Sequence, residues 1–349
     1  MPKYFLRRLL LVVPTFLGIT IVCFALTQFV PGGPVEQRLL QMRGLMGAEG
    51  AAGATAVATD GAVSLTETMR QDLMRHYGFD LPIHVRYKRW LVDNRLGLAM
   101  KSYQYTDKTA WQLIASRIPV SLVFGLAGFF LSYLVCIPLG IAKALRHGTR
   151  FDFASSAVIF IGYAIPAFAL GMLLKMLLCG TVDSLWDVFP LGGVASDGAD
   201  FLSPWGRFAD RVWHMALPVA CYVAGNFAVL TLLMKNSLLD QLSADYVRTV
   251  LAKGATRRRA VWGHALRNSL IPIATGFGGI LTVMFAGSVI IEKVFEIPGM
   301  GLLSLETLHT RDYPVFMAIL SLTSILGLLG QVLSDFCYVL IDPRIRFTR

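Results

Sequence analysis

The sequence predicts an all-α integral membrane protein with six transmembrane helices. Of its 349 residues, 55% are hydrophobic and only 15% are charged, whereas a soluble domain has about 25% charged residues. Six apolar runs are long enough to cross a bilayer, which takes about 20 residues. A chain of this length cannot bury six uniformly apolar helices without lipid, so the runs predict membrane spans.

The first apolar run extends from Leu9 to Val30 behind a basic N-terminus that carries Lys3, Arg7 and Arg8. Such a start is typical of a cleavable signal peptide or of an uncleaved first span. The run is about 22 residues long and no small-x-small site follows it directly, which favours the uncleaved span. Two prolines and two glycines in residues 31–34 end the helix.

Residues 31–117 form one long polar segment, predicted to be a small extracytoplasmic subdomain between the first and second spans. Its part 47–63 is rich in Ala and Gly and is expected to be mobile. Two amphipathic helices are expected after it. Their apolar stripes are Met69, Leu73 and Tyr77, then Ile83, Tyr87, Trp90 and Leu91. The alternative is a pair of helices lying flat on the membrane.

The remaining five spans belong to a transmembrane domain at 118–341, with 1–30 as the N-terminus and first span and 342–349 as a tail. Pro166 lies within the third span and should kink it. The five runs are about 118–142, 153–178, 214–234, 269–291 and 315–341.

The distribution of basic residues predicts the orientation of the spans. With the N-terminus inside, the inner segments hold 16 Lys and Arg and the two short outer loops hold four. Short cytoplasmic loops carry the excess of positive charge. Both termini and the segment Asp245–Pro272 are therefore predicted to be cytoplasmic. This topology and anionic lipid explain the net charge of +10, and nucleic acid is not an expected partner because the basic runs are short and lie beside spans.

The segment Asp245–Pro272 is the longest basic stretch outside the spans near the C-terminal end. Asp245 is expected to cap a helix over Tyr246–Lys253, and Gly254 to end it. Thr256 is expected to cap a second helix, with Val261 and Ala265 on one face and Trp262 and Leu266 beside them.

Three arginines break a local rule in the first turn of that second helix. Arg257, Arg258 and Arg259 lie where the helix dipole disfavours cations by about 0.3–1 kcal/mol each. Charges placed against local stability indicate an interaction outside the helix. The alternative is that they serve only topology and lipid contact.

This segment resembles the cytoplasmic coupling loop of ABC importer permeases, in the version found in peptide importers. Gly254 lies at the glycine position of that loop, and His264 and Leu266 lie at its Ile and Leu positions. Arg267 replaces the Pro, and residues 248–250 (Arg-Thr-Val) replace its Glu-Ala-Ala. These departures match the peptide branch, so no glutamate is carried over as a contact residue.

Further blocks resemble peptide permeases along nearly the whole chain. They are FLRRLLLVVPTFLGI, PGGPV, RHYGFDLPIHVRY, GTRFDFASS, IGYAIPAF and IDPRIRF. The extended segment before RHYGFDLPI, with FPLGG later, is most similar to the Yej-type subunit of oligopeptide importers, the type linked to microcin C-like peptides.

The resemblance implies a type I permease fold in a bacterial inner membrane and a subunit that passes oligopeptides. It implies as partners a second homologous permease, two ATPase subunits (or one fused ATPase), a periplasmic solute-binding protein, the peptide and membrane lipid. ATP and Mg would be bound by the ATPase and no cofactor by this chain. Within the coupling loop 237–268, helix 255–266 would meet the ATPase. The expected coupling residues are Tyr246, Arg248, Gly254, Ala255, Arg257, Arg258, Arg259, Val261, Trp262, His264 and Leu266.

Motifs for chemistry are missing from the sequence. It has no G-x-x-x-x-G-K-[ST] phosphate loop, no H-E-x-x-H and no G-x-S-x-G. The six histidines show no ligand spacing, and the five cysteines fall within or at the ends of apolar runs. We therefore expect a transport subunit with no catalytic or metal site, and not an enzyme.

Polar residues inside the spans are candidates for a translocation path. Gln331 and Asp335 lie at i and i+4 on one face of the sixth span, and Asn226 lies in the fourth. Each can instead stabilise a helix–helix contact. So few fixed charges argue against an ion-coupled pump, although a self-sufficient secondary transporter or channel remains the alternative function.

Overall fold

A computed structural model of the chain describes residues 2–29, 68–75, 78–180 and 186–341, with four isolated positions between 33 and 39. The Ala/Gly-rich stretch 47–63, Tyr77 and the basic tail 342–349 lie outside the described residues. Within that part the chain forms helices and turns, with two isolated β-bridges and no named strand.

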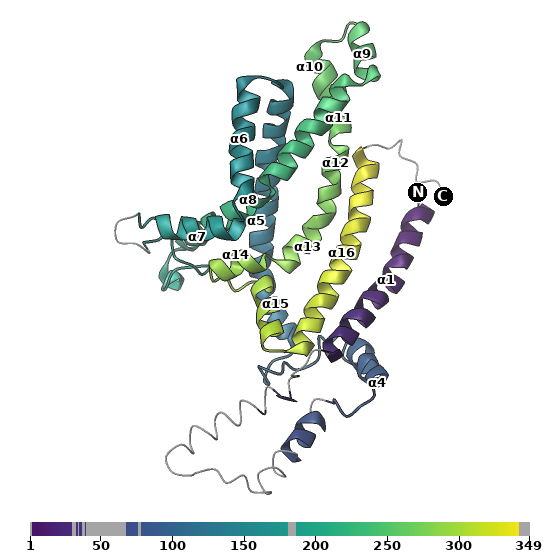
Figure 1. Ribbon diagram of the computed structural model, residues 1–349, viewed down its shortest axis with the longest axis vertical. Helices are drawn as coiled ribbons and strands as arrows, with labels where there is room; N and C mark the ends of the chain where they lie inside the picture. The colour runs from purple at the N-terminus through teal and green to yellow at the C-terminus, as the bar shows by residue number, and fades with distance from the viewer. Residues whose placement is uncertain are drawn as a thin grey trace. The chain divides into compact units, whose positions relative to one another are not determined.

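Four helices of the described chain are long and apolar enough to cross a membrane. They are α1 (Pro2–Phe29), α5 (Ala110–Leu145), α8 (Pro204–Ser243) and α16 (Tyr313–Ile341) (Figure 1). A fifth candidate is a bent pair, α6 (Arg150–Ala164) and α7 (Ala167–Leu178). The first, second, fourth and sixth predicted spans are therefore confirmed as helices, the second starting before residue 118.

The third predicted span is broken rather than kinked. α6 and α7 meet at 92°, and Ile165 between them is extended, with φ −87° and ψ 118°. The ring of Pro166 disfavours the helical conformation for the residue before it. The polypeptide therefore turns sharply where a gentle bend was expected.

The fourth predicted span, about 214–234, is the middle part of a longer helix. α8 begins at Pro204 and continues to Ser243, and Ala244 then leaves the helical region with ψ 146°. Lys235, the first charged residue after the predicted span, forms an ion pair with Asp152 within this helix.

The fifth predicted span is not one continuous helix. It consists of α12 (Ile271–Ala274), the 3₁₀ segment η4 (Thr275–Gly278) and α13 (Gly279–Ala286), followed by α14 (Val289–Val294). At the break, a Cβ atom on Gly278 would lie 2.3 Å from the carbonyl oxygen of Gly330 on α16. The two backbones touch there, which requires glycine. Hydropathy alone could not reveal such a break.

The chain divides into two compact units. The first comprises Met1–Pro14, Arg117–Leu303 and Thr323–Arg349. One of its cores joins α5, α7, α8 and α14 around Phe124, Cys221 and Phe295. Another joins the later parts of α5 and α8 to the segment after Ala244, around Met234 and Leu238.

The second unit comprises Thr15–Ser116 and Ser304–Leu322. It contains a helix at 68–75, α4 (Ile83–Lys88) and a π-helical turn η1 (Arg89–Asp93). Trp90 is buried and belongs to one core with Phe24 of α1 and Met317 of α16. Of the second predicted stripe, Trp90 is buried and Tyr87 and Leu91 are half-buried against the same core, whereas Ile83 is 59% exposed.

Candidate coupling surface

The first helix of the basic segment is α9 (Asp245–Ala252), which follows α8 directly. Ala244 is its N-cap and makes no side-chain cap, so the predicted cap by Asp245 is wrong. Val247 is buried against Leu238 of α8 in the core around Met234. The Tyr246 hydroxyl donates to Gln241 Oε1 at 2.7 Å. The helix is thereby fixed to the end of α8 by packing and one side-chain hydrogen bond.

Gly254 ends this helix as predicted. Its φ is +84°, in the left-handed region. Its N–H donates to the Leu251 carbonyl at 2.9 Å, and the Ala255 N–H donates to the Val250 carbonyl at 3.3 Å. No atom lies within 4 Å of a Cβ placed here. Glycine is therefore needed for the backbone conformation and not for space.

The second helical segment begins at the predicted cap. Thr256 Oγ1 accepts a hydrogen bond from the Arg259 N–H at 3.3 Å. Then α10 (Arg257–Ala260), the π-helical turn η3 (Val261–Ala265) and α11 (Leu266–Ser269) follow one another without a gap. Figure 1 shows α9 and α10 as a hairpin beyond the C-terminal end of α8.

One face of this segment packs on the chain itself. Val261 and Ala265 are buried, Leu266 is half-buried, and Ala265 belongs to the same core as Met234. Ser237 Oγ of α8 donates to the Ser269 carbonyl at 2.8 Å. Val261 therefore has almost no surface left for a partner.

The stretch from Leu251 to His264 also exposes basic and apolar side chains. Trp262 is 54% and Leu251 41% exposed. Exposed polar residues surround them: Arg248, Arg257, Arg258, Arg259 and His264. Within the described part of the chain, Arg257–Arg259 make no ion pair. We call this exposed surface, from Leu251 to His264, the coupling surface; it is suited to contact with an acidic and apolar protein surface.

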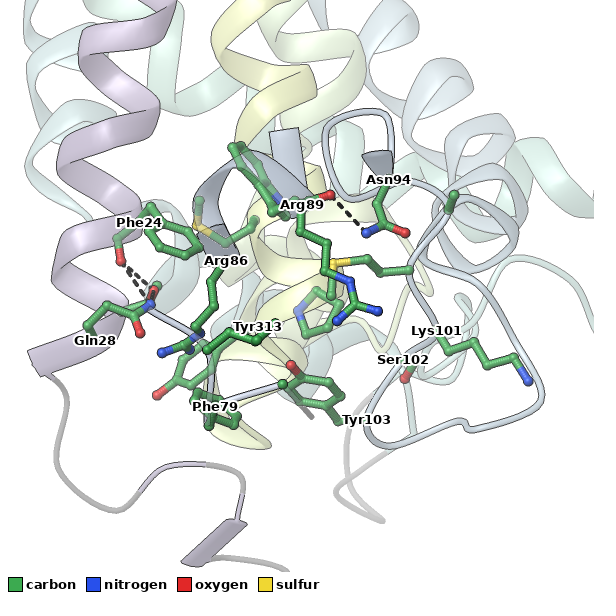
Figure 2. A pocket seen from close by; sticks show the side chains of 18 of the residues that line it. Phe24, Gln28, Phe79, Arg86, Arg89, Asn94, Lys101, Ser102, Tyr103 and Tyr313 are labelled. Carbon is green, nitrogen blue, oxygen red and sulfur yellow. Dashed lines mark hydrogen bonds between the residues drawn. The ribbon is translucent and has the colours of Figure 1, made fainter. Parts of the chain in front are cut away.

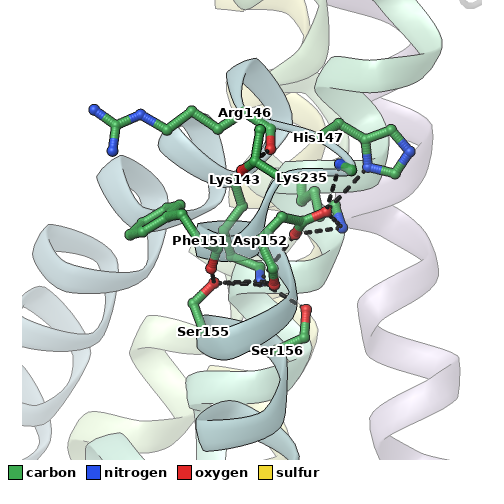
Figure 3. Close-up of polar contacts among 10 residues, drawn as sticks. Lys143, Arg146, His147, Phe151, Asp152, Ser155, Ser156 and Lys235 are labelled. Atoms are coloured by element: carbon green, nitrogen blue, oxygen red, sulfur yellow. Dashed lines mark hydrogen bonds and ion pairs between the residues drawn. The ribbon is translucent and has the colours of Figure 1, made fainter.

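A buried ionic cluster joins α8 to α5 and α6 (Figure 3). Lys235 Nζ lies 2.8 Å from both carboxylate oxygens of Asp152. Lys143 Nζ lies 3.1 Å from Asp152 Oδ1, and its side chain is fully buried. It also donates to Ser155 Oγ at 2.7 Å and Ser156 Oγ at 2.8 Å.

Sequence reasoning missed this cluster. Lys143 was counted only as a topological charge in an inner loop, and the block GTRFDFASS was used only for its resemblance. The pairing joins positions far apart in the chain, so periodicity carries no sign of it. The available signal was an unpaired Lys at the end of an apolar run followed by Asp and two serines.

The translocation-path candidates are not gathered in one place. Asp335 accepts a hydrogen bond from the Tyr4 hydroxyl at 3.1 Å and pairs with Arg8 at 2.5 Å. Gln331 is exposed. The exposed Asn226 donates to the Tyr222 carbonyl of its own helix at 3.2 Å. An ion pair within the chain was not among the alternatives for Asp335, and the path itself stays a prediction.

No group of three or more His, Cys, Asp and Glu that could hold a metal ion occurs among the described residues. The cysteines are free, and Cys136, Cys179 and Cys221 are buried. The polar side chains of the described residues form hydrogen bonds and ion pairs within the chain.

Comparison with known proteins identifies the family. The model of the family described as "Binding-protein-dependent transport system inner membrane component" matches residues 136–347, more than half of the chain. The chain belongs to this permease family. The matched range includes the whole coupling surface and the Asp152 cluster.

Curated relatives match this permease along its whole length. It is 39% identical to the inner membrane ABC transporter permease protein YejB of Escherichia coli O157:H7, with 99% of each chain covered. It is 37% identical to the peptidoglycan transport system permease protein YejB of Agrobacterium fabrum, with 100% and 99% covered. It is 32% identical to the oligopeptide transport system permease protein AppB of Bacillus subtilis, with 99% and 100% covered. The resemblance to peptide-type ABC importer permeases is thereby confirmed.

Proposed function

We propose that this permease is one transmembrane half of an ATP-driven importer that passes oligopeptides across a bacterial inner membrane. Relatives named as peptide and oligopeptide permeases support the substrate class. The observation that carries the mechanism is the coupling surface. There Arg257–Arg259, which make no ion pair with any described residue, and the exposed Trp262 lie on a segment whose buried side chains pack on α8. The similarity to two YejB proteins, one of them named as a peptidoglycan transport permease, favours the Yej subtype. The resemblance to that subtype puts microcin C-like peptides among the proposed substrates.

The partners follow from the family and its relatives. A second homologous permease would complete the membrane domain, and two ATPase subunits, or one fused ATPase, would bind ATP and Mg. A periplasmic solute-binding protein would deliver the peptide. In this arrangement the chain has six spans with both termini in the cytoplasm, the fifth span being the interrupted stretch α12 to α13.

The coupling surface would be the place where the ATPase contacts and moves this chain. ATP binding would bring the ATPases together and push α10 and η3, and hydrolysis would reset them. Trp262 and Leu251 would enter an apolar cleft, and Arg257–Arg259 would meet acidic groups at its edge. Tyr246, Gly254, Ala255 and Leu266 would hold the segment in shape, while Arg248 and His264 extend the exposed face. Gln331 and Asn226 would face the translocated peptide.

The decisive experiment changes Trp262 to Asp in the complete importer, reconstituted in proteoliposomes. A buried Trp at an interface typically contributes 2 kcal/mol or more, about 30-fold in affinity. We therefore expect peptide-stimulated ATP hydrolysis and peptide uptake to fall together by more than tenfold. The control is Trp205→Asp, because Trp205 is 76% exposed and outside the coupling surface. Unchanged hydrolysis and uptake in Trp262→Asp would show that this face is not the coupling contact.

The alternative of a self-sufficient transporter is tested by omission. The permease reconstituted without ATPase subunits is expected to move no peptide, with or without an ion gradient. Uptake by that preparation would refute the proposal.

A further inference from the structure

The second compact unit contains a cavity of about 600 Å³ that the coupling mechanism does not use. Its walls come from the last turns of α1, from α4 and η1, from the segment 98–106 and from the start of α16 (Figure 2). These parts lie far apart in the sequence, and the polar segment before α5 brings them together.

The charged groups of this cavity all have the same sign. Arg86, Arg89 and Lys101 line it, and no carboxylate does among the residues that the structure describes. Asp312, which precedes Tyr313, is buried and already accepts hydrogen bonds from Ser102 Oγ and, at 3.0 Å, from the Tyr103 N–H. The cavity is therefore an uncompensated positive site that favours an anion.

Arg86 is the most enclosed of these cations. Its guanidinium lies 4.2 Å from the ring centre of Phe79, and no ion pair of Arg86 occurs among the described residues. Burial lowers the pKa of Arg86 from its ordinary value, because the charged form loses water. An anion in the cavity would restore the lost solvation, and a guanidinium binds phosphate oxygens in a bidentate manner.

The cavity lies at the level where membrane spans end. Phe24, Thr27 and Gln28 belong to the last turns of α1, and Tyr313 and Met317 to the first turns of α16. Both helices are candidate spans. Their ends mark the boundary between acyl chains and headgroups, where phosphates lie and where Trp and Tyr are enriched.

Exposed apolar side chains occur on the same helix, on the face of α1 that is turned away from the cavity. Val22 is 59%, Leu26 60% and Phe29 82% exposed, whereas the cavity-lining Phe24, Thr27 and Gln28 lie on the other face. An exposed apolar face on a candidate span is suited to contact with acyl chains. Phospholipid headgroups would therefore be at hand at the level of the cavity, which favours a lipid phosphate as the anion.

We propose that this cavity binds the phosphate headgroup of an anionic phospholipid, with Arg86 and Arg89 as the phosphate-binding groups. The Tyr313 hydroxyl, which is buried and makes no hydrogen bond in the described part of the chain, adds a polar group to the wall. The site is independent of the transported substrate.

The test measures lipid binding to the complete importer, purified in detergent and stripped of lipid. Native mass spectrometry follows titration with dihexanoyl phosphatidylglycerol, with dihexanoyl phosphatidylcholine as the zwitterionic comparison. Each cation near a phosphate contributes about fivefold in affinity. We expect phosphatidylglycerol to be retained in preference to phosphatidylcholine. The double variant Arg86→Gln/Arg89→Gln should weaken the affinity for phosphatidylglycerol roughly 25-fold.

Matched variants separate this site from general charge and from folding. Lys88→Gln removes an exposed cation of α4 that does not line the cavity, and is expected to bind as the unaltered chain does. Arg86→Lys keeps the charge and is expected to lose much less affinity than Arg86→Gln. Lys101→Gln changes an exposed residue and is expected to weaken binding about fivefold.

Three results would overturn the proposal. The first is equal retention of both lipids. The second is a double variant that binds phosphatidylglycerol as the unaltered chain does. The third is displacement of the bound lipid by millimolar inorganic phosphate or by an oligopeptide, which would assign the cavity to a soluble anion or to the substrate. Loss of lipid binding with intact peptide uptake would leave the proposed import function standing.

Discussion

Asp152→Asn perturbs the ionic cluster between α5, α6 and α8 with almost no change in volume. The carboxylate lies 2.8 Å from Lys235 Nζ through both oxygens and 3.1 Å from Lys143 Nζ. The side chain of Lys143 is fully buried, and that of Lys235 is 12% exposed. In the variant, the neutral amide of Asn replaces the carboxylate, so the ammonium groups of Lys143 and Lys235 lose the negative charge that they share in this cluster.

Removing one member of a buried ion pair costs about 3–5 kcal/mol, because the remaining charge stays buried and unpaired. Lys143 keeps three neutral acceptors, namely the Asp152 carbonyl and the hydroxyls of Ser155 and Ser156. The lower end of the range is therefore expected, about 3 kcal/mol in the free energy of unfolding. Adding Lys235→Met should recover part of the loss, because only one unpaired cation then remains.

The assay is equilibrium unfolding of the purified permease in mixed detergent–SDS micelles, read as a double-mutant cycle over Asp152 and Lys235. Asp245→Asn is the control, since its side chain is 95% exposed and pairs with Arg248 only at 3.7 Å. The control should leave the unfolding midpoint unchanged. A loss below about 1 kcal/mol for Asp152→Asn, together with no coupling to Lys235, would refute a role of the cluster in holding α6 to α8.

Three other changes test the remaining contacts, each by the same unfolding measurement. Arg8→Asp should lower the free energy of unfolding by about 1 kcal/mol, a small loss because Arg8 is partly exposed. Combining it with Asp335→Arg reverses the ion pair and should restore stability. A combined variant less stable than either single variant would contradict the ion pair. The buried Glu292 carboxylate accepts hydrogen bonds from the Ser288 N–H at 3.1 Å and the Leu302 N–H at 2.7 Å. In Glu292→Gln the amide N–H₂ would face one of these donors, so the free energy of unfolding should fall by about 1–3 kcal/mol. An unchanged stability would contradict that geometry. Gly278→Ala should destabilise strongly, because its Cβ would lie 2.3 Å from the Gly330 carbonyl oxygen, and a neutral result would show that the backbones do not touch.

Hydropathy was sufficient for the long helices and insufficient for their interruptions. α1 and α16 are apolar over more than the thickness of a bilayer, so the sequence alone predicts them. Pro166 signals a disturbance, but whether a proline kinks or breaks a helix depends on what packs around it. The 3₁₀ segment Thr275–Gly278 depends on contact with Gly330, a neighbour that no local pattern identifies.

The coupling surface was predictable where its structure is local. Gly254 and Thr256 act on their immediate neighbours, and the structure confirms both roles. The sequence was less informative about which apolar side chains of this segment point inward and which point outward. Val261 and Trp262 were both expected to meet a partner, but Val261 is buried within the chain and Trp262 is 54% exposed. The cavity near Arg86 was missed because its wall joins three separate parts of the chain.

α8 connects the coupling surface to the membrane helices more directly than the sequence indicated. Leu238 packs on α9, Ser237 bonds to the end of α11, and Lys235 pairs with Asp152 on α6. These three contacts lie within about one turn of one uninterrupted helix. A close-packed core and a buried ion pair resist gradual deformation. Under the proposed function, we therefore expect a force on α10 to displace α8 and α6 together instead of bending the segment between them. The movement would then be taken up where the helices are already interrupted, at Ile165–Pro166 and at Thr275–Gly278. For this reason Asp152→Asn should reduce the coupling of ATP hydrolysis to uptake even where the coupling surface remains intact.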